Sequence, residues 1–239
     1  MCKIFLDFYK FLASMPPYEP SDVLVPPERG WPSITPEKMS KLDKNHTVVD
    51  LLKHLPYLNM DRREKGDGRF NYRITYDTEV LDYRGRVLEE ALKACREPAY
   101  NQAYMPPHGP FPAWVVAIAS FTSRNGEYAL LDTTDGTITR LLNAGHSYDA
   151  TYANNDPRSW RDKCEYETFP AAIYFENLKR EFEQSLWLPC WERGEFALMG
   201  PHDQKYDEVR HIYASHGWPN AFKREECGQA LRQWDSDAN

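Results

Sequence analysis

The residues best suited to chemistry lie in one polar segment, Gly145-His146-Ser147-Tyr148-Asp149, directly after a run of apolar residues. Histidine changes its charge near neutral pH, so His146 is a candidate general acid or base, with Tyr148 and Asp149 as candidate partners. The alternative is a solvated histidine without a chemical role. His108, which lies between prolines, is a weaker candidate for a binding residue.

Four residues are further candidates for a binding surface. Trp31, Trp160 and Trp218 lie in predicted loops or at helix ends, where an aromatic side chain can anchor an interface. The alternative for each of them is packing against the core. Asp132 ends a predicted buried strand, and its carboxylate would either face a cleft or accept N–H bonds within the following turn, which we favour.

Common catalytic and nucleotide-binding motifs are missing from the sequence. It contains no G-x-S-x-G, H-E-x-x-H, G-x-G-x-x-G or G-x-x-x-x-G-K-[ST] pattern. His211 and His216 are five positions apart, which directs them to different faces of a helix. The five cysteines form no C-x-x-C pair. We therefore predict no metal, no cofactor and reduced cysteines.

The candidate site residues must be positioned by the rest of the fold. Residues 113–142 are predicted to form its centre, a three-stranded antiparallel meander. Apolar residues are dense there, and the Asn125-Gly126 and Asp135-Gly136 pairs are typical of tight hairpin turns. Both faces of the first strand are apolar, which predicts a sheet covered on both sides. Alternation places Trp114, Val116 and Ile118 on one face and Val115, Ala117 and Ala119 on the other.

Helices are predicted on both sides of the meander. Apolar periodicity indicates helices over 3–15, 47–55, 87–95 and 222–234, a short one after the N-cap Thr35, and one ending at Gly217. A further helix should begin at an N-cap Thr168, with an apolar stripe from Ala171 to Leu186, and residues 186–190 should then pair with the sheet. Residues 143–162 are predicted to form a long loop, and the proline-rich segments 16–36 and 98–112 to wrap the core. The whole pattern predicts a single α+β domain over residues 1–239.

Composition narrows the classes of partner. Of 239 residues 41% are hydrophobic and 27% charged, as in ordinary globular proteins, and the formal net charge is −7. Without a basic cluster, nucleic acid is not expected as a partner. No apolar run is long enough for a membrane span, and the odd number of dispersed cysteines favours a cytoplasmic location.

Several segments resemble the SUKH superfamily, which includes fungal cell-wall-synthesis regulators and bacterial toxin-immunity proteins. The likeness lies in WVVAIASF and LLDTTDGTI of the meander, and in GWPSITPE, VVDLLKHLPY, TEVLDYRG and YDEVRHIYASHGWPN, which are similar to a filamentous-fungal branch. The resemblance implies an α+β fold and a role in protein binding, with no shared catalytic residues.

Two functions remain open at this point. The first is an intracellular protein-interaction module that uses loop aromatics and an acidic surface. The alternative is a cofactor-independent isomerase, cyclase or dehydratase of fungal secondary metabolism, with His146, Tyr148 or Asp149 at the mouth of an aromatic-lined pocket. An apolar cavity of roughly 300 Å³ or more with convergent polar groups would favour the second function.

Overall fold

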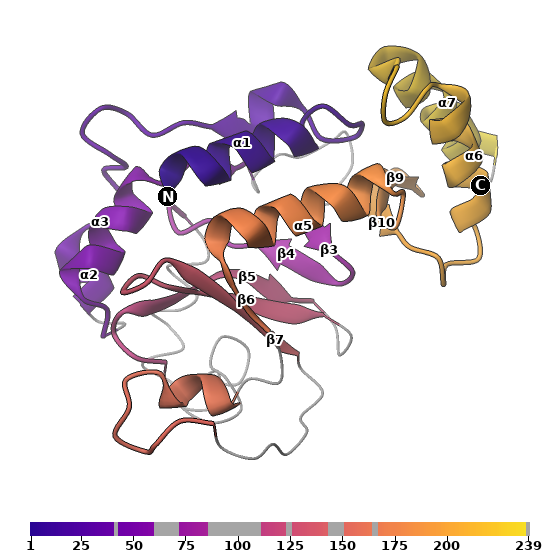
Figure 1. Cartoon of the computed structure of the whole chain (residues 1–239). Helices are drawn as coiled ribbons and strands as arrows, with labels where there is room; N and C mark the ends of the chain where they lie inside the picture. The colour runs from indigo at the N-terminus through magenta and orange to yellow at the C-terminus, as the bar shows by residue number, and fades with distance from the viewer. Residues whose placement is uncertain are drawn as a thin grey trace.

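The computed structural model describes residues 1–40, 43–59, 72–85, 111–122, 126–142, 151–163 and 167–237. A six-stranded antiparallel sheet lies at its centre, in the order β3-β4-β5-β6-β7-β8 (Figure 1). Its strands are β3 (Arg73–Thr75), β4 (Thr78–Val80), β5 (Val115–Phe121), β6 (Glu127–Asp132), β7 (Thr137–Leu142) and β8 (Thr168–Pro170).

Two small two-stranded sheets and several helices surround this sheet. The small sheets pair β1 (Val23–Leu24) with β2 (Tyr57–Leu58), and β9 (Leu188–Glu192) with β10 (Glu195–Met199). The α-helices within the described ranges are α1 (Cys2–Leu12), α2 (Pro36–Ser40), α3 (His46–His54), α5 (Ala171–Glu183), α6 (Tyr206–Ser215) and α7 (Arg224–Asp237). The same ranges contain the 3-10 turns η1 (Pro20–Asp22) and η3 (Ser159–Lys163). The fold class is α+β, as predicted.

The meander predicted over residues 113–142 is confirmed as β5, β6 and β7. Strands β6 and β7 pair from Glu127 with Leu142 to Asp132 with Thr137, and the tight turn between them contains Gly136 at a φ of +71°. A positive φ costs little only for glycine, so the Asp-Gly pair identifies this turn from sequence. The Asn125 side of the other predicted turn lies outside the described residues.

Both faces of the sheet are covered. Figure 1 shows α1 and α5 side by side over one face, where the rings of Phe5 and Phe8 each lie 4.8 Å from the ring of Phe175. A smaller apolar cluster on the other face contains Val115, Tyr128, Leu130, Leu141 and Trp160. The central strands therefore lie between two apolar layers, as their double-sided hydrophobicity predicts.

Side-chain alternation along β5 departs from the prediction at two residues. Val116 and Ile118 join the larger core and Val115 the smaller cluster, as expected. Ala119 nevertheless joins the larger core, because the pairing register with β6 shifts between Ala117 and Ala119. Such a bulge moves the following side chains to the other face. Trp114, which precedes the strand, packs against the smaller cluster.

The predicted start of α5 is wrong by two residues, since the N-cap is Pro170 and not Thr168. Thr168 lies in β8, where its hydroxyl is 2.7 Å from that of Thr139, and the helix begins at Ala171 after Pro170. The hydroxyl is engaged across the sheet and does not cap the helix. At the other end the helix stops at Glu183, so Leu186, predicted to extend its apolar stripe, is 38% exposed.

Residues 186–190 do not join the large sheet. Strand β9 pairs with β10 through a tight turn in which Arg193 and Gly194 have φ angles of 55° and 76°. Two consecutive positive φ angles match the twist of a hairpin, so local pairing replaces the predicted pairing with the sheet. The helices predicted over 3–15, 47–55 and 222–234 are observed with small shifts as α1, α3 and α7, whereas 87–95 lies outside the described part of the chain.

None of the helices in the described ranges has the length and apolar composition needed to cross a membrane.

Candidate functional site

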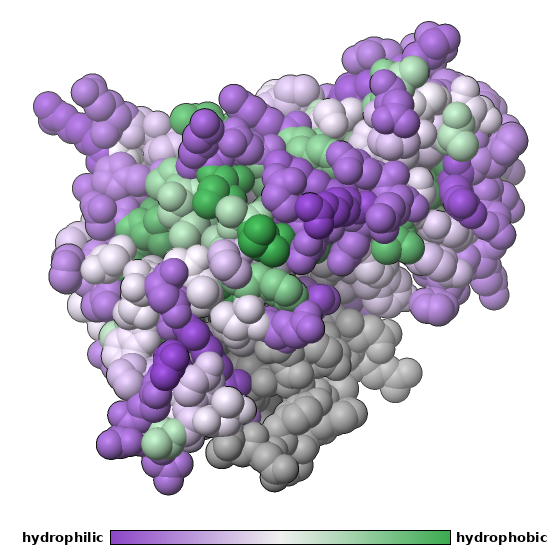
Figure 2. Space-filling model, viewed as in Figure 1, coloured by the Kyte–Doolittle hydropathy of each residue, from purple (hydrophilic) through white to green (hydrophobic). Residues whose placement is uncertain are grey.

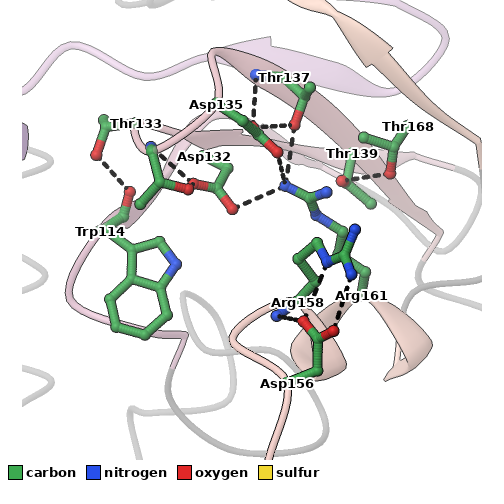
Figure 3. Close-up of polar contacts among 11 residues, drawn as sticks. Trp114, Asp132, Thr133, Asp135, Thr137, Thr139, Asp156, Arg158, Arg161 and Thr168 are labelled. Atoms are coloured by element: carbon green, nitrogen blue, oxygen red, sulfur yellow. Dashed lines mark hydrogen bonds and ion pairs between the residues drawn. The ribbon is translucent and has the colours of Figure 1, made fainter. Parts of the chain in front are cut away.

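The candidate site is built around the turn between β6 and β7. Asp132 ends β6 and is almost completely buried. Its Oδ1 accepts the backbone N–H of Thr134 at 2.9 Å and the Thr134 hydroxyl at 2.6 Å (Figure 3). This is the Asx-type bond that the sequence predicts, and it determines the path of the chain into the turn.

A buried arginine holds the same turn from the side of η3. Arg161 Nη2 lies 2.8 Å from Asp132 Oδ2, 2.7 Å from Asp135 Oδ2 and 3.1 Å from Thr137 Oγ1 (Figure 3). Burial acts to lower the pKa of the Arg161 guanidinium, but the two carboxylates outweigh it and raise that pKa. The arginine is therefore a permanently charged cross-link between η3 and the β6–β7 turn.

The segment that carries Arg161 is itself tied together by local bonds. Asp162 accepts the backbone N–H groups of Thr151 and Tyr152, each at 2.9 Å. Asp156 pairs with Arg158, whose hydrogen bonds lower the pKa of Asp156 to about 2. These bonds turn residues 151–163 into a compact unit that Arg161 attaches to the sheet.

The opposite side of the β6–β7 turn forms one wall of a pocket of about 320 Å³, which we call the turn pocket. Side chains alternate along a strand, so Leu131 points away from Asp132 and its arginine. The first turn of α1 and the outer face of α3 complete the walls. The lining residues are Leu131, Thr133 and Gly136 from the turn, Met1 and Cys2 from α1, and Thr47, Asp50, Leu51 and His54 from α3.

His54 is the titratable group of the turn pocket that is suited to proton transfer. Its Nδ1 is 2.8 Å from the carbonyl oxygen of Asp50 and 3.4 Å from the Asp50 carboxylate. A carbonyl oxygen only accepts, so Nδ1 carries a proton, and in the uncharged form of the ring the lone pair lies on Nε2. A Cβ at Gly30 would stand 3.1 Å from Nε2, so this atom lies close to the Gly30 backbone, and only a residue without a side chain fits there.

Helix α3 has this position because of its sequence. Asn45 precedes it, and its side chain accepts the N–H of Val48 at 3.0 Å, which satisfies one of the unpaired donors of the first turn. Val48 and Leu52 are buried, so the residues on the other side of the helix face the pocket. Asp50 and His54 were not among the candidates predicted from the sequence. They are four positions apart in a predicted helix, which places them one helical turn from each other, and this spacing could have identified the pair.

Four of the other predicted site residues lie outside the described part of the chain, so their roles stay predictions, and the remaining three are tryptophans. The four are His108, His146, Tyr148 and Asp149. Figure 3 shows Trp114 and Arg161 on the two sides of the β6–β7 turn. Trp160, which precedes Arg161 in η3, is 5% exposed and packs edge to face with Phe111.

Two further tryptophans also pack inward. Trp31 Nε1 donates to the carbonyl of Leu55 at 2.7 Å, and Trp218 Nε1 donates to the carbonyl of Phe182 at 3.0 Å. Trp31, Trp160 and Trp218 therefore have separate neighbours in the described structure, and each follows the alternative in which it packs on the core.

Comparison with known proteins found no match: no protein-family model, no curated protein and no solved structure is similar to this chain. Membership of the SUKH superfamily stays a prediction.

Proposed function

We propose that the protein binds a small, mostly apolar molecule in the turn pocket and transfers a proton on it through His54. The observation that carries this proposal is a pocket of about 320 Å³ with apolar walls and a few polar groups at its edge. Sites for small molecules have this combination, with volumes upward of about 300 Å³. Cys2, Leu51 and Leu131 supply apolar contact, whereas Thr47 and Thr133 supply hydroxyl groups.

The reaction class that suits this site is an isomerisation without a cofactor. Neutral His54 accepts a proton from one carbon of the ligand on Nε2, and the imidazolium returns it to another carbon, so the reaction needs no further reactant. The nearby Asp50 carboxylate stabilises the imidazolium. His54 thus takes the role that the sequence predicts for His146.

A dye-binding experiment tests the pocket. N-phenylnaphthylamine is a neutral apolar dye whose fluorescence rises on transfer from water, and we expect saturable binding at one site. Thr47→Trp places a large ring at the pocket and should weaken dye binding at least about tenfold. Glu37→Trp, at an exposed position on α2 that does not line the pocket, should bind as the wild type does. Equal affinity in both variants would contradict the proposal.

Chemical modification tests the availability of His54. Diethyl pyrocarbonate acylates unprotonated imidazole nitrogen, so His54 should react in the free protein and be protected by the dye. Exposed His202, which does not line the turn pocket, should react equally with and without dye. Peptide-resolved mass spectrometry separates the two residues. Modification of His54 that is unaffected by saturating dye would remove it from the site.

A second candidate function is the protein-interaction module expected from the resemblance. It is favoured by an apolar area over the first turns of α1 and α5, where Met1 and Ile173 are 38% and 48% exposed (Figure 2). In this alternative, a protein partner places an apolar side chain in the turn pocket and covers Ile173. Exposed apolar areas of this kind are typical of interaction surfaces.

Two substitutions at exposed apolar residues test whether a protein partner binds this surface. Ile173→Asp should abolish capture of a partner that the wild type captures, whereas Val25→Asp, at a residue 59% exposed, should not affect it. A partner that both variants retain would not use this surface.

A further inference from the structure

A second, polar pocket lies between the β3–β4 turn and the segment that joins β10 to α6. Its volume is about 270 Å³, and it shares no residue with the turn pocket. We call it the polar pocket. Its charged and polar lining consists of Arg73, Tyr76 and Asp77 on one side, and Glu192, Asp203 and Lys205 on the other.

The two cations of the polar pocket are only loosely paired. Arg73 Nη1 lies 3.5 Å from Asp77 Oδ1, and Lys205 Nζ lies 4.0 Å from Glu192 Oε1. Both separations exceed those of ordinary N–H···O hydrogen bonds, about 2.7–3.2 Å. Arg73 Nε is also buried without a hydrogen-bond partner among the described residues. A bound carboxylate would pair with the Arg73 guanidinium more closely than Asp77 does, since a guanidinium presents parallel N–H groups to a carboxylate.

The anionic side of the pocket is provided by Asp203 and Glu192. Asp203 Oδ2 accepts the N–H of Gly200 at 2.7 Å, which holds the carboxylate in place at the start of the segment before α6. Asp203 and Tyr76 both line the pocket, and the Asp203 charge is the main cause of the raised pKa of Tyr76. Ring stacking of Tyr76 on Trp187 supports the tyrosine from behind.

This arrangement discriminates between classes of ligand. A simple anion of similar size would be repelled by the three carboxylates of the lining, Asp77, Glu192 and Asp203. A ligand with both charges can satisfy both sides. The small volume also favours a compact molecule.

We propose that the polar pocket binds a free α-amino acid, with its carboxylate on Arg73 and its ammonium group on Asp203 and Glu192. This site is independent of the function proposed for the turn pocket, and neither proposal depends on the other. The pocket contacts both the central sheet and the β9–β10 region, so a bound amino acid would join these two parts.

Calorimetric titration with a panel of free amino acids and two blocked analogues tests the proposal. N-acetylalanine lacks the ammonium group and alaninamide lacks the carboxylate, so we expect each to bind at least about tenfold more weakly than the best amino acid. Blocked analogues that bind as tightly as the free amino acid would overturn the proposal. So would the absence of saturable binding to every amino acid in the panel.

Substitutions locate the binding to this pocket. Arg73→Gln and Asp203→Asn should each weaken amino-acid binding at least about tenfold. Arg158→Gln, at an exposed ion pair of residues 151–163, should leave it unchanged. If circular dichroism shows that Arg73→Gln is unfolded, Asp203→Asn and Glu192→Gln decide the outcome, because both residues are placed on the ammonium group and lie outside the core. Unchanged affinity in a folded pocket variant would overturn the assignment.

Discussion

At the scale of single residues, the buried ion pair of Asp132 and Arg161 should contribute most to keeping the site in place. The two side chains are 1% and 9% exposed. Arg161→Met leaves the Asp132 carboxylate buried without its cation, which should lower the free energy of unfolding by about 3–5 kcal/mol. Urea denaturation measures this change.

Two further variants control this prediction. Arg158→Met removes an exposed, solvent-screened pair with Asp156 and should leave stability nearly unchanged. Asp132→Asn in the Arg161→Met background should restore part of the stability, because the amide keeps the Asx acceptor and removes the buried charge. Equal losses in Arg161→Met and Arg158→Met would show that the cross-link is not structural.

The second buried carboxylate, that of Glu127, should make the protein less stable as the pH rises. Ordinary acid unfolding has the opposite sign, since stability is then lost as the pH falls. Burial raises the pKa of Glu127 above its usual 4.5, against the opposing effect of Arg140 at 2.7 Å. The folded protein then holds this proton more tightly than the unfolded chain. The contribution to stability is therefore complete below the unfolded-state pKa of 4.5 and is lost as the pH rises through the raised pKa.

Comparison of Glu127→Gln with the wild type isolates this effect. The stability of the wild type relative to the variant should fall as the pH rises above about 4.5 in urea-denaturation series. Glu195→Gln, at an exposed position on β10, should show no such trend. A difference that rises with pH would mean that the pair with Arg140 outweighs burial.

At the scale of elements, two glycines should respond to alanine in opposite ways. Gly194 has a φ of +76° in the β9–β10 turn, and no atom lies within 4 Å of the place that a Cβ would take. Gly194→Ala should therefore cost about 1–2 kcal/mol through backbone strain alone. Gly228 lies within α7, where a Cβ would meet Pro16 at an ordinary 3.4 Å. Gly228→Ala should stabilise the protein by up to about 1 kcal/mol.

Thermal unfolding of the two variants measures both effects. A destabilised Gly228→Ala would show that the contact of α7 with Pro16 has no room for a methyl group.

At the scale of the whole molecule, Tyr213 joins the C-terminal helices to the start of the chain. Its buried hydroxyl lies 2.7 Å from the carbonyl oxygens of Pro16 and Pro189, residues of the segment after α1 and of β9. Tyr213→Phe removes the donor from both buried carbonyls and should lower the free energy of unfolding by about 1–3 kcal/mol. Tyr152→Phe, at a partly exposed ring, should have little effect. Equal stability of both variants in urea would contradict this role.

The sequence predicted local structure better than it predicted the site. The tight turn at Asp135-Gly136 and the apolar periodicity of α1, α3 and α7 depend on residues close together in the chain. Such local patterns can be recognised in the sequence. Thr168 was misassigned because its hydroxyl could cap a helix or bond across strands, and only its neighbour Thr139 decides between these roles. The turn pocket was not predicted, because its walls come from three separate segments of the chain.

The sequence by itself determined the α+β class, the meander, most helix positions and the Asx role of Asp132, because each depends on short-range geometry and hydrophobic pattern. Only the tertiary structure decided that Arg161 bonds to Asp132, 29 positions away, that the tryptophans pack inward, and that His54 faces the first turn of α1. Such pairings depend on how distant segments pack, and neither composition nor spacing along the chain specifies that packing.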